Sequence, residues 1–279
     1  MITAEIIKDS VNSRKNRLTS WVLTYPRFIH SELMTHRMFS RNAASSRAIP
    51  IKKMLAAVKD NPAKPEFWGA NQKGMQAAAE VSPEVRDECE NVWIDARDKM
   101  IEAVEELERL GLHKQISNRL LEPWAHMTVI LTASEFENFF ALRAHPDAQP
   151  EFQKLAYLML ERYQQSVPKL LQPGEWHIPF DERMPDVPFE TKLKIAVARC
   201  ARVSYLTFDG EINVKDDIEL HDRLKQSGHW SPFEHVAYAA PGTPQVGNFV
   251  GWVQYRKQWA GENRRDFRVH EPPSPTPQQ

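Results

Sequence analysis

The sequence contains few cysteines and no long apolar run, and each absence excludes a class of protein. Cys89 and Cys200 are its two cysteines, which cannot form a disulfide framework and indicate a reducing compartment. We expect both to be small buried apolar side chains. No apolar run is long enough to span a bilayer, and no signal-peptide pattern opens the chain. The sequence therefore predicts a soluble, cytoplasmic protein.

An excess of charge of one sign is missing as well. The 36 Lys and Arg residues balance 37 Asp and Glu residues, which gives a formal net charge of -1. Any anion site must therefore be local, and the balance argues against nucleic acid as a partner. The histidines include no pair at zinc-finger or His-Glu-x-x-His spacing, and Gly-x-Gly-x-x-Gly is absent. The sequence thus predicts no metal site and no Rossmann turn for a nucleotide cofactor.

A local anion site is what residues 35–47 provide. This segment holds one His, three Arg, three Ser and one Asn, with no acidic residue. Arginine forks bind phosphate through two parallel hydrogen bonds, and hydroxyls fill the remaining positions around a phosphate group. A large anionic cofactor would suit the same set of donors. From composition alone, a solvated basic surface loop is the alternative.

Hydrophobic periodicity predicts mostly helices. A strand over 18–25 ends at Pro26, and a helix over 28–38 then carries the basic segment at its C-terminal end. Residues 51–81 show little periodicity, which predicts a long loop with short helical pieces. Further helices, of which the first two have Ser82 and Ser134 as candidate N-caps, are expected over 82–111, 134–143 and 148–167.

The order of residues in 35–47 resembles the signature of the flavin-dependent thymidylate synthases, Arg-His-Arg-x-x-Ser-x-Asn-Glu-x-Ser-x-Arg-Tyr. The residues in register are His36, Arg37, Ser40, Asn42, Ser45 and Arg47. Thr35, Ala43 and Ala48 depart from it, standing where the family has Arg, Glu and Tyr. Glu32 stands where the family usually has Gln near the nucleotide phosphate. A carboxylate there would repel phosphate unless Arg47 or Arg119 neutralises it.

Further blocks extend the resemblance, in an unexpected order. Residues 119–123 resemble the family's Arg-x-x-Leu-Pro, and 138–151 resemble its Asn-x-x-x-Leu-Arg followed by Ala-Gln-x-Glu. Residues 198–205 and 227–235 look like its Ala-Arg-Val-Ser-Tyr and Gly-His-x-Ser/Thr-Pro-Phe-Glu-His motifs. In the family these two motifs precede the Arg-His-Arg motif, whereas here they follow it. The resemblance therefore implies a rearranged or circularly permuted chain.

The C-terminal part also suggests a partial duplication. Residues 248–256 look like a second, degraded copy of the helix that leads to the basic motif, with Trp259 where the first Ser of the motif would be. A chance match of a short helix is the alternative. We divide the chain into four parts: a motif-bearing and helical region (1–172), a linker (173–188), a second half similar to the family (189–270) and a disordered Pro-rich tail (271–279).

The resemblance implies both a fold and an activity. The fold class is α+β, with a mixed or antiparallel sheet packed against long helices. The activity is FAD-dependent transfer of a one-carbon unit from methylenetetrahydrofolate to C5 of a deoxypyrimidine monophosphate, of the dUMP to dTMP type. NADPH would be the reductant, in a homotetramer with shared flavin sites. Two alternatives are a folate-dependent hydroxymethyltransferase acting on dUMP or dCMP, and a non-catalytic nucleotide- or nucleic-acid-binding relative.

The resemblance also assigns residues to the site. Arg143 would be catalytic, because a fixed guanidinium stabilises negative charge at N3 and the adjacent carbonyl of the pyrimidine without proton transfer. The other residues on the substrate side would be Glu32, Ser45, Ser46, Arg47 and Arg119. The residues on the cofactor side would be Thr35, His36, Arg37, Ser40, Asn42, Asn138, Ser204, His229 and Ser231.

Overall fold

Two long antiparallel strands, β2 (Arg17–Pro26) and β4 (His126–Ala133), form the centre of the main sheet. The computed structural model describes residues 1–207 and 210–263. The strand order is β3-β4-β2-β1-β5, in which β5 runs parallel to β1 and the other neighbours are antiparallel. The remaining strands of this sheet are β1 (Thr3–Asn12), β3 (Ser40–Ala43) and β5 (Lys169–Leu171).

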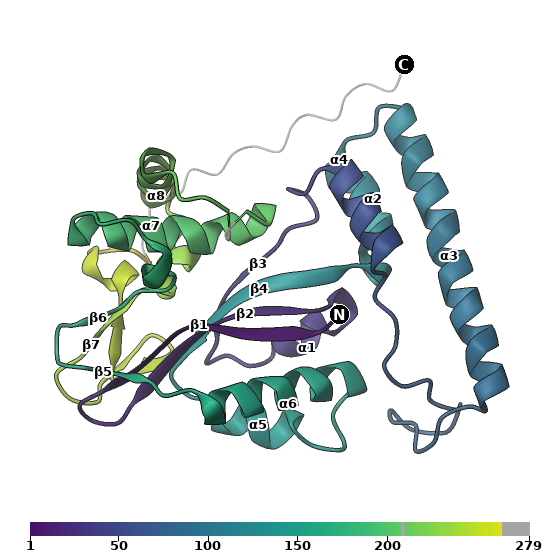
Figure 1. Ribbon diagram of the computed structural model, residues 1–279, viewed down its shortest axis with the longest axis horizontal. Helices are drawn as coiled ribbons and strands as arrows, with labels where there is room; N and C mark the ends of the chain where they lie inside the picture. The colour runs from purple at the N-terminus through teal and green to yellow at the C-terminus, as the bar shows by residue number, and fades with distance from the viewer. Residues whose placement is uncertain (208–209, 264–279) are drawn as a thin grey trace.

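Both faces of the central strands are covered, which explains why nearly every residue of β2 is buried. On one face Trp21 and Tyr25 pack in a core with residues of α5 (Glu137–Arg143) and α6 (Pro150–Gln165), the two helices that lie below the sheet in Figure 1. On the other face Val22 packs with Cys200 of α7 (Phe189–Arg202). The strand predicted over 18–25 is confirmed.

A group of helices lies at one end of the sheet, on the right in Figure 1. The longest is α3 (Pro83–Arg109), which begins as predicted: Ser82 accepts a hydrogen bond from the Val85 amide at 3.4 Å, and Pro83 occupies the first turn. Its buried residues lie in the C-terminal half and pack onto the neighbouring elements. These neighbours are α2 (Ile51–Asp60), α4 (Lys114–Ser117) and η2 (Asn118–Trp124).

The C-terminal segment folds back onto the main sheet. Helix α7 packs against α8 (Val214–Ser227), and both lie near a small sheet of order β10-β7-β6 (Figure 1). The strands of this segment are β6 (Trp176–His177), β7 (Ala237–Ala239), β8 (Gln245–Val246), β9 (Phe249–Val250) and β10 (Trp252–Gln254). Its short 3-10 helices are η3 (Asp181–Arg183), η4 (Val203–Tyr205), η5 (Ser231–Glu234) and η6 (Tyr255–Gln258). Both η4 and η5 contact β3, so the C-terminal motifs lie against the basic segment. The fold is α+β, as expected.

Two expectations about the N-terminal half are wrong. The helix expected over 28–38 is shorter, because η1 (Arg27–Ile29) and α1 (His30–Leu33) give way to a turn. The Arg41 guanidinium donates to the Leu33 and His36 carbonyl oxygens at 3.1 and 3.2 Å, which satisfies carbonyls that another helical turn would otherwise use. The segment 51–81 contains a ten-residue helix, α2, because Met54 and Val58 share the face that packs beside α3.

Two further expectations fail because tertiary contacts override local signals. Ser134 does not cap α5, whose N-cap is Phe136; the Ser134 hydroxyl instead accepts a hydrogen bond from the Val250 amide at 2.9 Å. Residues 248–256 form β9, β10 and the start of η6 rather than a helix. In β10 the burial alternates, with Trp252 and Gln254 buried, which is the period of a strand.

The segment 173–188 contains β6 and η3, and His177 in β6 is fully buried. The division of the chain into two halves joined by this segment stays a prediction. Arg264 and Arg265 of the expected second copy, and the expected tail over 271–279, lie outside the described residues. Within the described part, every helix is too short or too polar to cross a membrane.

Candidate functional site

Arg143 is held at the C-terminal end of α5 by three neighbours. Its Nε donates a hydrogen bond to Nε2 of His36 at 3.1 Å, and its Nη1 donates to the Glu32 carboxylate at 3.0 Å. The guanidinium carbon lies 4.7 Å from the centre of the Phe152 ring, within cation–π range. These contacts fix the plane of the guanidinium, and its remaining N–H groups are available to a ligand. The arginine that neutralises Glu32 is therefore Arg143, rather than Arg47 or Arg119.

His36 is a neutral hydrogen-bond acceptor at this site. Burial, followed by the positive charges of Arg143 and Arg41, lowers the pKa of His36 to about 4. Because Nε2 accepts from Arg143, the ring proton resides on Nδ1. The ring centre lies 5.1 Å from that of Phe139 and 5.6 Å from that of Phe39. The imidazole therefore positions the arginine without adding a second charge.

A cavity of about 530 Å³ opens beside Arg143. Its walls come from the turn of the basic segment and from α5, two parts of the chain that are about a hundred residues apart in sequence. The predicted site residues that line it are Thr35, His36, Arg37, Asn138 and Arg143. Phe39 and Phe139 supply aromatic surface to the same wall. The cavity thus combines apolar surface with a few convergent polar groups, as small-molecule sites do.

A second group of predicted residues gathers around Glu122 of η2. The Glu122 carboxylate accepts from the Ser46 hydroxyl at 2.6 Å and from Arg119 at 2.8 Å, and it pairs with Arg27 at 3.1 Å. Its position stands where the resemblance places Leu in Arg-x-x-Leu-Pro, and that departure is the signal by which the sequence could have indicated its role. Two arginines around one carboxylate leave a net positive charge at this group.

Arg47 directly follows Ser46 of the second group. Unlike Arg27 and Arg119, it pairs with no carboxylate among the described residues. Its side chain is exposed, and among the described residues it has no hydrogen-bond or ion-pair partner. The Ser45 amide lies 3.5 Å from the Ser204 carbonyl oxygen, so the end of the basic segment touches the Ala-Arg-Val-Ser-Tyr block. A phosphate approaching Ser45 and Ser46 would meet Arg47 without having to displace a carboxylate from it.

A third group joins β3 to the Gly-His-Trp-Ser-Pro-Phe-Glu-His block. The Ser40 hydroxyl donates to the Glu234 carboxylate at 2.7 Å, and the Asn42 side chain lies 3.1 Å from Nε2 of His235. Ser231 and His229 of the same block are exposed. The block that follows the basic segment in the sequence therefore packs against it in space, and the permuted order stays a prediction. Sequence reasoning missed His235 and Glu234 as neighbours of the motif.

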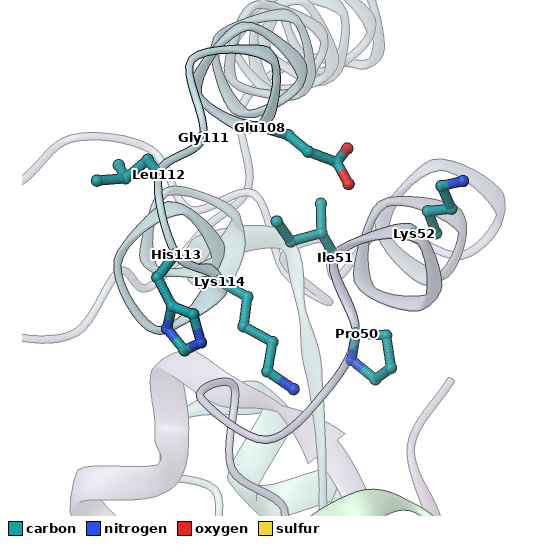
Figure 2. A pocket seen from close by; sticks show the side chains of 8 residues that line it. All are labelled: Pro50, Ile51, Lys52, Glu108, Gly111, Leu112, His113 and Lys114. Carbon is teal, nitrogen blue, oxygen red and sulfur yellow. The ribbon is translucent and has the colours of Figure 1, made fainter.

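A second cavity, also of about 530 Å³, contains none of the predicted site residues. Figure 2 shows Pro50 and Ile51 at the start of α2 on one side, and His113 and Lys114 on the other. The Lys114 ammonium donates to the Ala48 carbonyl oxygen at 2.8 Å, which ties α4 to the end of the basic segment. The second cavity therefore lies beside the end of the basic segment. It shares no lining residue with the Arg143 cavity.

The buried histidines predict that acid destabilises the protein. Burial lowers the pKa of His36 to about 4 and that of His235 to about 3. An unfolded histidine titrates near pH 6.5, so below that pH the unfolded state binds more protons and the free energy of unfolding falls as pH decreases. Each such histidine contributes a slope that approaches about 1.4 kcal/mol per pH unit between the unfolded and folded pKa values. Above about pH 6.5 the contribution of both histidines is fully present.

Urea denaturation at about pH 7.5 and about pH 5 measures this dependence. We expect His235→Gln to show a shallower loss of unfolding free energy between the two pH values than the wild type. His145→Gln is the matched control, because His145 is exposed. Equal pH dependence in all three proteins would contradict the assignment of buried neutral histidines.

Comparison with known proteins shows the family to which the chain belongs. A family model described as thymidylate synthase complementing protein matches residues 18–169, more than half of the 279 residues. Similar solved structures include a UMP/dUMP methylase PolB from Streptomyces cacaoi bound with 5-Br dUMP (16% identity, 59% of this chain and 90% of that chain covered, TM-score 0.49). The same methylase bound with 5-Br UMP gives 16% identity, 59% and 89% coverage, and a TM-score of 0.48. No curated protein matches the sequence at a significant level. Because the matched range includes the basic segment, Arg119 and Arg143, the chain belongs to the thymidylate synthase complementing protein family.

Proposed function

We propose that this protein transfers a one-carbon unit from methylenetetrahydrofolate to C5 of a deoxypyrimidine monophosphate, with bound FAD and with NADPH as the reductant. The observation that supports the proposal is the Arg143 cavity, which gathers five residues assigned to the site by resemblance. They come from two separate parts of the chain, and both lie inside the range that the family model matches. Membership of the family gives the reaction class, and the cavity gives residues that suit it.

Arg143 suits activation of the pyrimidine. C5 of a uracil ring is a weak nucleophile, and it gains electron density when negative charge at N3 and the adjacent carbonyl is stabilised. A guanidinium held by Glu32, His36 and Phe152 needs little reorganisation to provide that stabilisation. Neutral His36 accepts from Arg143, so it leaves the positive charge of the arginine in place.

The group around Glu122 suits the nucleotide phosphate. Arg27, Arg119 and Arg47 supply cations near Ser45 and Ser46, against the one carboxylate of Glu122. A phosphate would compete with Glu122 for Arg119, whereas Arg47 is free to meet it from the start. Arg47 should therefore contribute most to phosphate binding, because its contact requires no ion pair to break.

The Arg143 cavity also fits a flavin. Phe39 and Phe139 give a planar ring system an apolar wall, Asn138 and His36 lie within the lining, and exposed Arg37 offers a cation for the diphosphate. The other residues that we assign to the cofactor are Thr35, Ser40, Asn42, Ser204, His229 and Ser231. When bound, the flavin supplies hydride transfer, while the protein supplies binding, orientation and electrostatics.

We expect the purified protein to contain FAD or to bind added FAD. Visible absorbance of the purified protein and titration with FAD, followed by flavin fluorescence, measure this. Arg37→Ala should weaken FAD binding, whereas Arg183→Ala should not, because Arg183 pairs with Glu5 and does not line the cavity. A colourless protein that FAD neither binds nor stabilises against heat would contradict the proposal.

Mass spectrometry of the product from dUMP or dCMP then identifies the base, and a hydroxymethyl product would mean that water replaces hydride in the last step.

A further inference from the structure

A row of buried polar side chains crosses the main sheet and ends at Asn42. The hydrogen bonds run from Asn42 to His235 Nε2 (3.1 Å), from His235 Nδ1 to Thr132 (2.9 Å), from Thr132 to Ser20 (2.6 Å), from Ser20 to His177 Nε2 (2.9 Å) and from His177 Nδ1 to Ser10 (2.9 Å). Apart from Asn42, every member is fully buried. We call these six side chains the polar relay. It links β1, β2, β4 and β6 to the motif strand β3.

Both imidazoles in the polar relay are neutral and use both ring nitrogens. Burial lowers the pKa of His235 to about 3 and that of His177 well below its usual value. A neutral histidine has one N–H donor and one acceptor nitrogen, so it passes the direction of hydrogen bonding from one neighbour to the next. The Thr132 and Ser20 hydroxyls do the same. Two arrangements are therefore self-consistent: every bond donates away from Asn42, or every bond donates toward it.

The surroundings of Asn42 select the first arrangement. With the amide nitrogen toward His235, that nitrogen lies 3.1 Å from Nε2 and 3.2 Å from the carbonyl oxygens of both Arg41 and Ser231. The opposite orientation would set the amide oxygen against those two carbonyl oxygens. At the other end of the polar relay, reversal would change only the direction of the hydrogen bond between His177 and the Ser10 hydroxyl, which can donate or accept. Asn42 therefore donates to His235, and the proton resides on Nδ1 of both His235 and His177.

We propose that His235 is a positioning residue that, together with the carbonyl oxygens of Arg41 and Ser231, holds the Asn42 amide nitrogen turned inward, so that the amide oxygen is presented to a hydrogen-bond donor on the bound ligand. The two carbonyl oxygens and the acceptor nitrogen of His235 all favour this orientation, because each accepts a hydrogen bond from the amide nitrogen. The polar relay holds His235 in the accepting tautomer, and reversing the amide would reverse every tautomer behind it. That the ligand is the planar heterocycle of a flavin rests on the proposed function.

The cost of burial argues for this role over simple packing. Buried polar groups are destabilising unless each is hydrogen-bonded, and apolar side chains of similar size would fill the same positions in the sheet without that risk. All five buried members of the polar relay are satisfied by one another. What the polar version adds over an apolar one is a buried acceptor, His235 Nε2, for the Asn42 amide nitrogen.

Long-range ¹H–¹⁵N correlation NMR of protein labelled with ¹⁵N-histidine reads the tautomer of each ring. Signals are assigned with His177→Gln and His235→Gln. We expect both rings to be neutral at neutral pH, with the proton on Nδ1. A proton on Nε2 of either ring would overturn the proposal, because the relay would then run the other way or be broken.

The variant Asn42→Asp tests whether the relay transmits direction. A carboxylate only accepts, so the proton should move to Nε2 in His235 and, through Thr132 and Ser20, in His177. Asn138→Asp places the same charge on exposed α5, outside the relay, and should change neither ring. In the Thr132→Val background the His177 tautomer should be the same with and without Asn42→Asp, because valine interrupts the polar relay between His235 and Ser20. A response confined to His235, whether a new tautomer or a second proton, would overturn the proposal.

Titration with FAD connects the relay to the ligand. Asn42→Ala should raise the dissociation constant about tenfold, the size expected for one lost hydrogen bond. An unchanged constant would overturn the ligand-facing role of Asn42. If the wild type shows the expected tautomers but binds no FAD, the proposed function fails and the relay stands. If FAD binds and the tautomers are reversed, the relay fails and the proposed function stands.

Discussion

Replacing Arg143 with alanine is expected to lower turnover by about 100-fold or more, the range seen when one donor to transition-state charge is removed. FAD binding should persist, because the other cofactor residues are untouched. Arg143→Lys should rescue poorly, since an ammonium is a point charge that cannot span the Glu32 carboxylate, His36 Nε2 and a pyrimidine at once. Steady-state turnover of dUMP, with flavin content measured on the same samples, checks the result.

The matched control for Arg143 is Glu32→Gln. Glutamine keeps an acceptor for Nη1 of Arg143 and removes the negative charge, so the guanidinium should stay in place. We expect Glu32→Gln to retain turnover far better than Arg143→Ala. Loss of turnover in Glu32→Gln as deep as in Arg143→Ala would mean that the carboxylate itself takes part in the chemistry. Unchanged turnover in Arg143→Ala would show that this arginine does not activate the pyrimidine.

The second large effect is expected from Arg47, and it should contrast with Arg256. Arg47 is exposed and free among the described residues, so Arg47→Ala should weaken nucleotide binding tenfold or more. A lost charge-assisted contact to phosphate is worth about 1.5–3 kcal/mol, and each factor of ten corresponds to about 1.4 kcal/mol. The melting temperature of Arg47→Ala should stay close to that of the wild type, because no protein contact is removed.

Arg256→Ala should act on stability instead. Arg256 pairs with Glu234 and Glu262, and its Nε donates to the Glu262 carboxylate at 2.8 Å. Removing it leaves Glu234 without its cation and Glu262 with Lys257 alone, at a cost of about 1–3 kcal/mol of unfolding free energy. Calorimetric titration of dUMP and melting curves of both variants separate the two roles. Weaker nucleotide binding in Arg256→Ala with a normal Arg47→Ala would place the phosphate at the C-terminal segment.

The packing around Trp259 supports a structural role for the C-terminal segment. Trp259 lies where the first Ser of a second motif copy would be, and its ring centre is 4.7 Å from that of Tyr255 and 5.4 Å from that of Trp230. Aromatic rings packed in this way fill the space that a phosphate would need. The sequence indicated the crowding correctly, but it indicated a helix where the structure has strands, because β10 pairs with β7.

The sequence by itself determined the family resemblance of the basic segment and the elements with strong local signals. The order of His36, Arg37, Ser40 and Asn42 identified the basic segment, and the Ser82-Pro83 start of α3 is fixed by capping chemistry that acts within one turn. The strand over 18–25 followed from its β-branched and aromatic residues and from Pro26 at its end. These features depend on neighbours in sequence, so they can be read without the fold.

Only the tertiary structure decided which of those residues meet. Arg143 pairs with Glu32 and His36 across about a hundred residues, and Glu122 pairs with both Arg119 and Arg27. His235 reaches Asn42 because the C-terminal segment folds back on β3. Hydrogen bonds and ion pairs depend on distances of a few ångströms between atoms. Such distances are set by how strands and helices pack, and no pattern of neighbouring residues in the sequence records them.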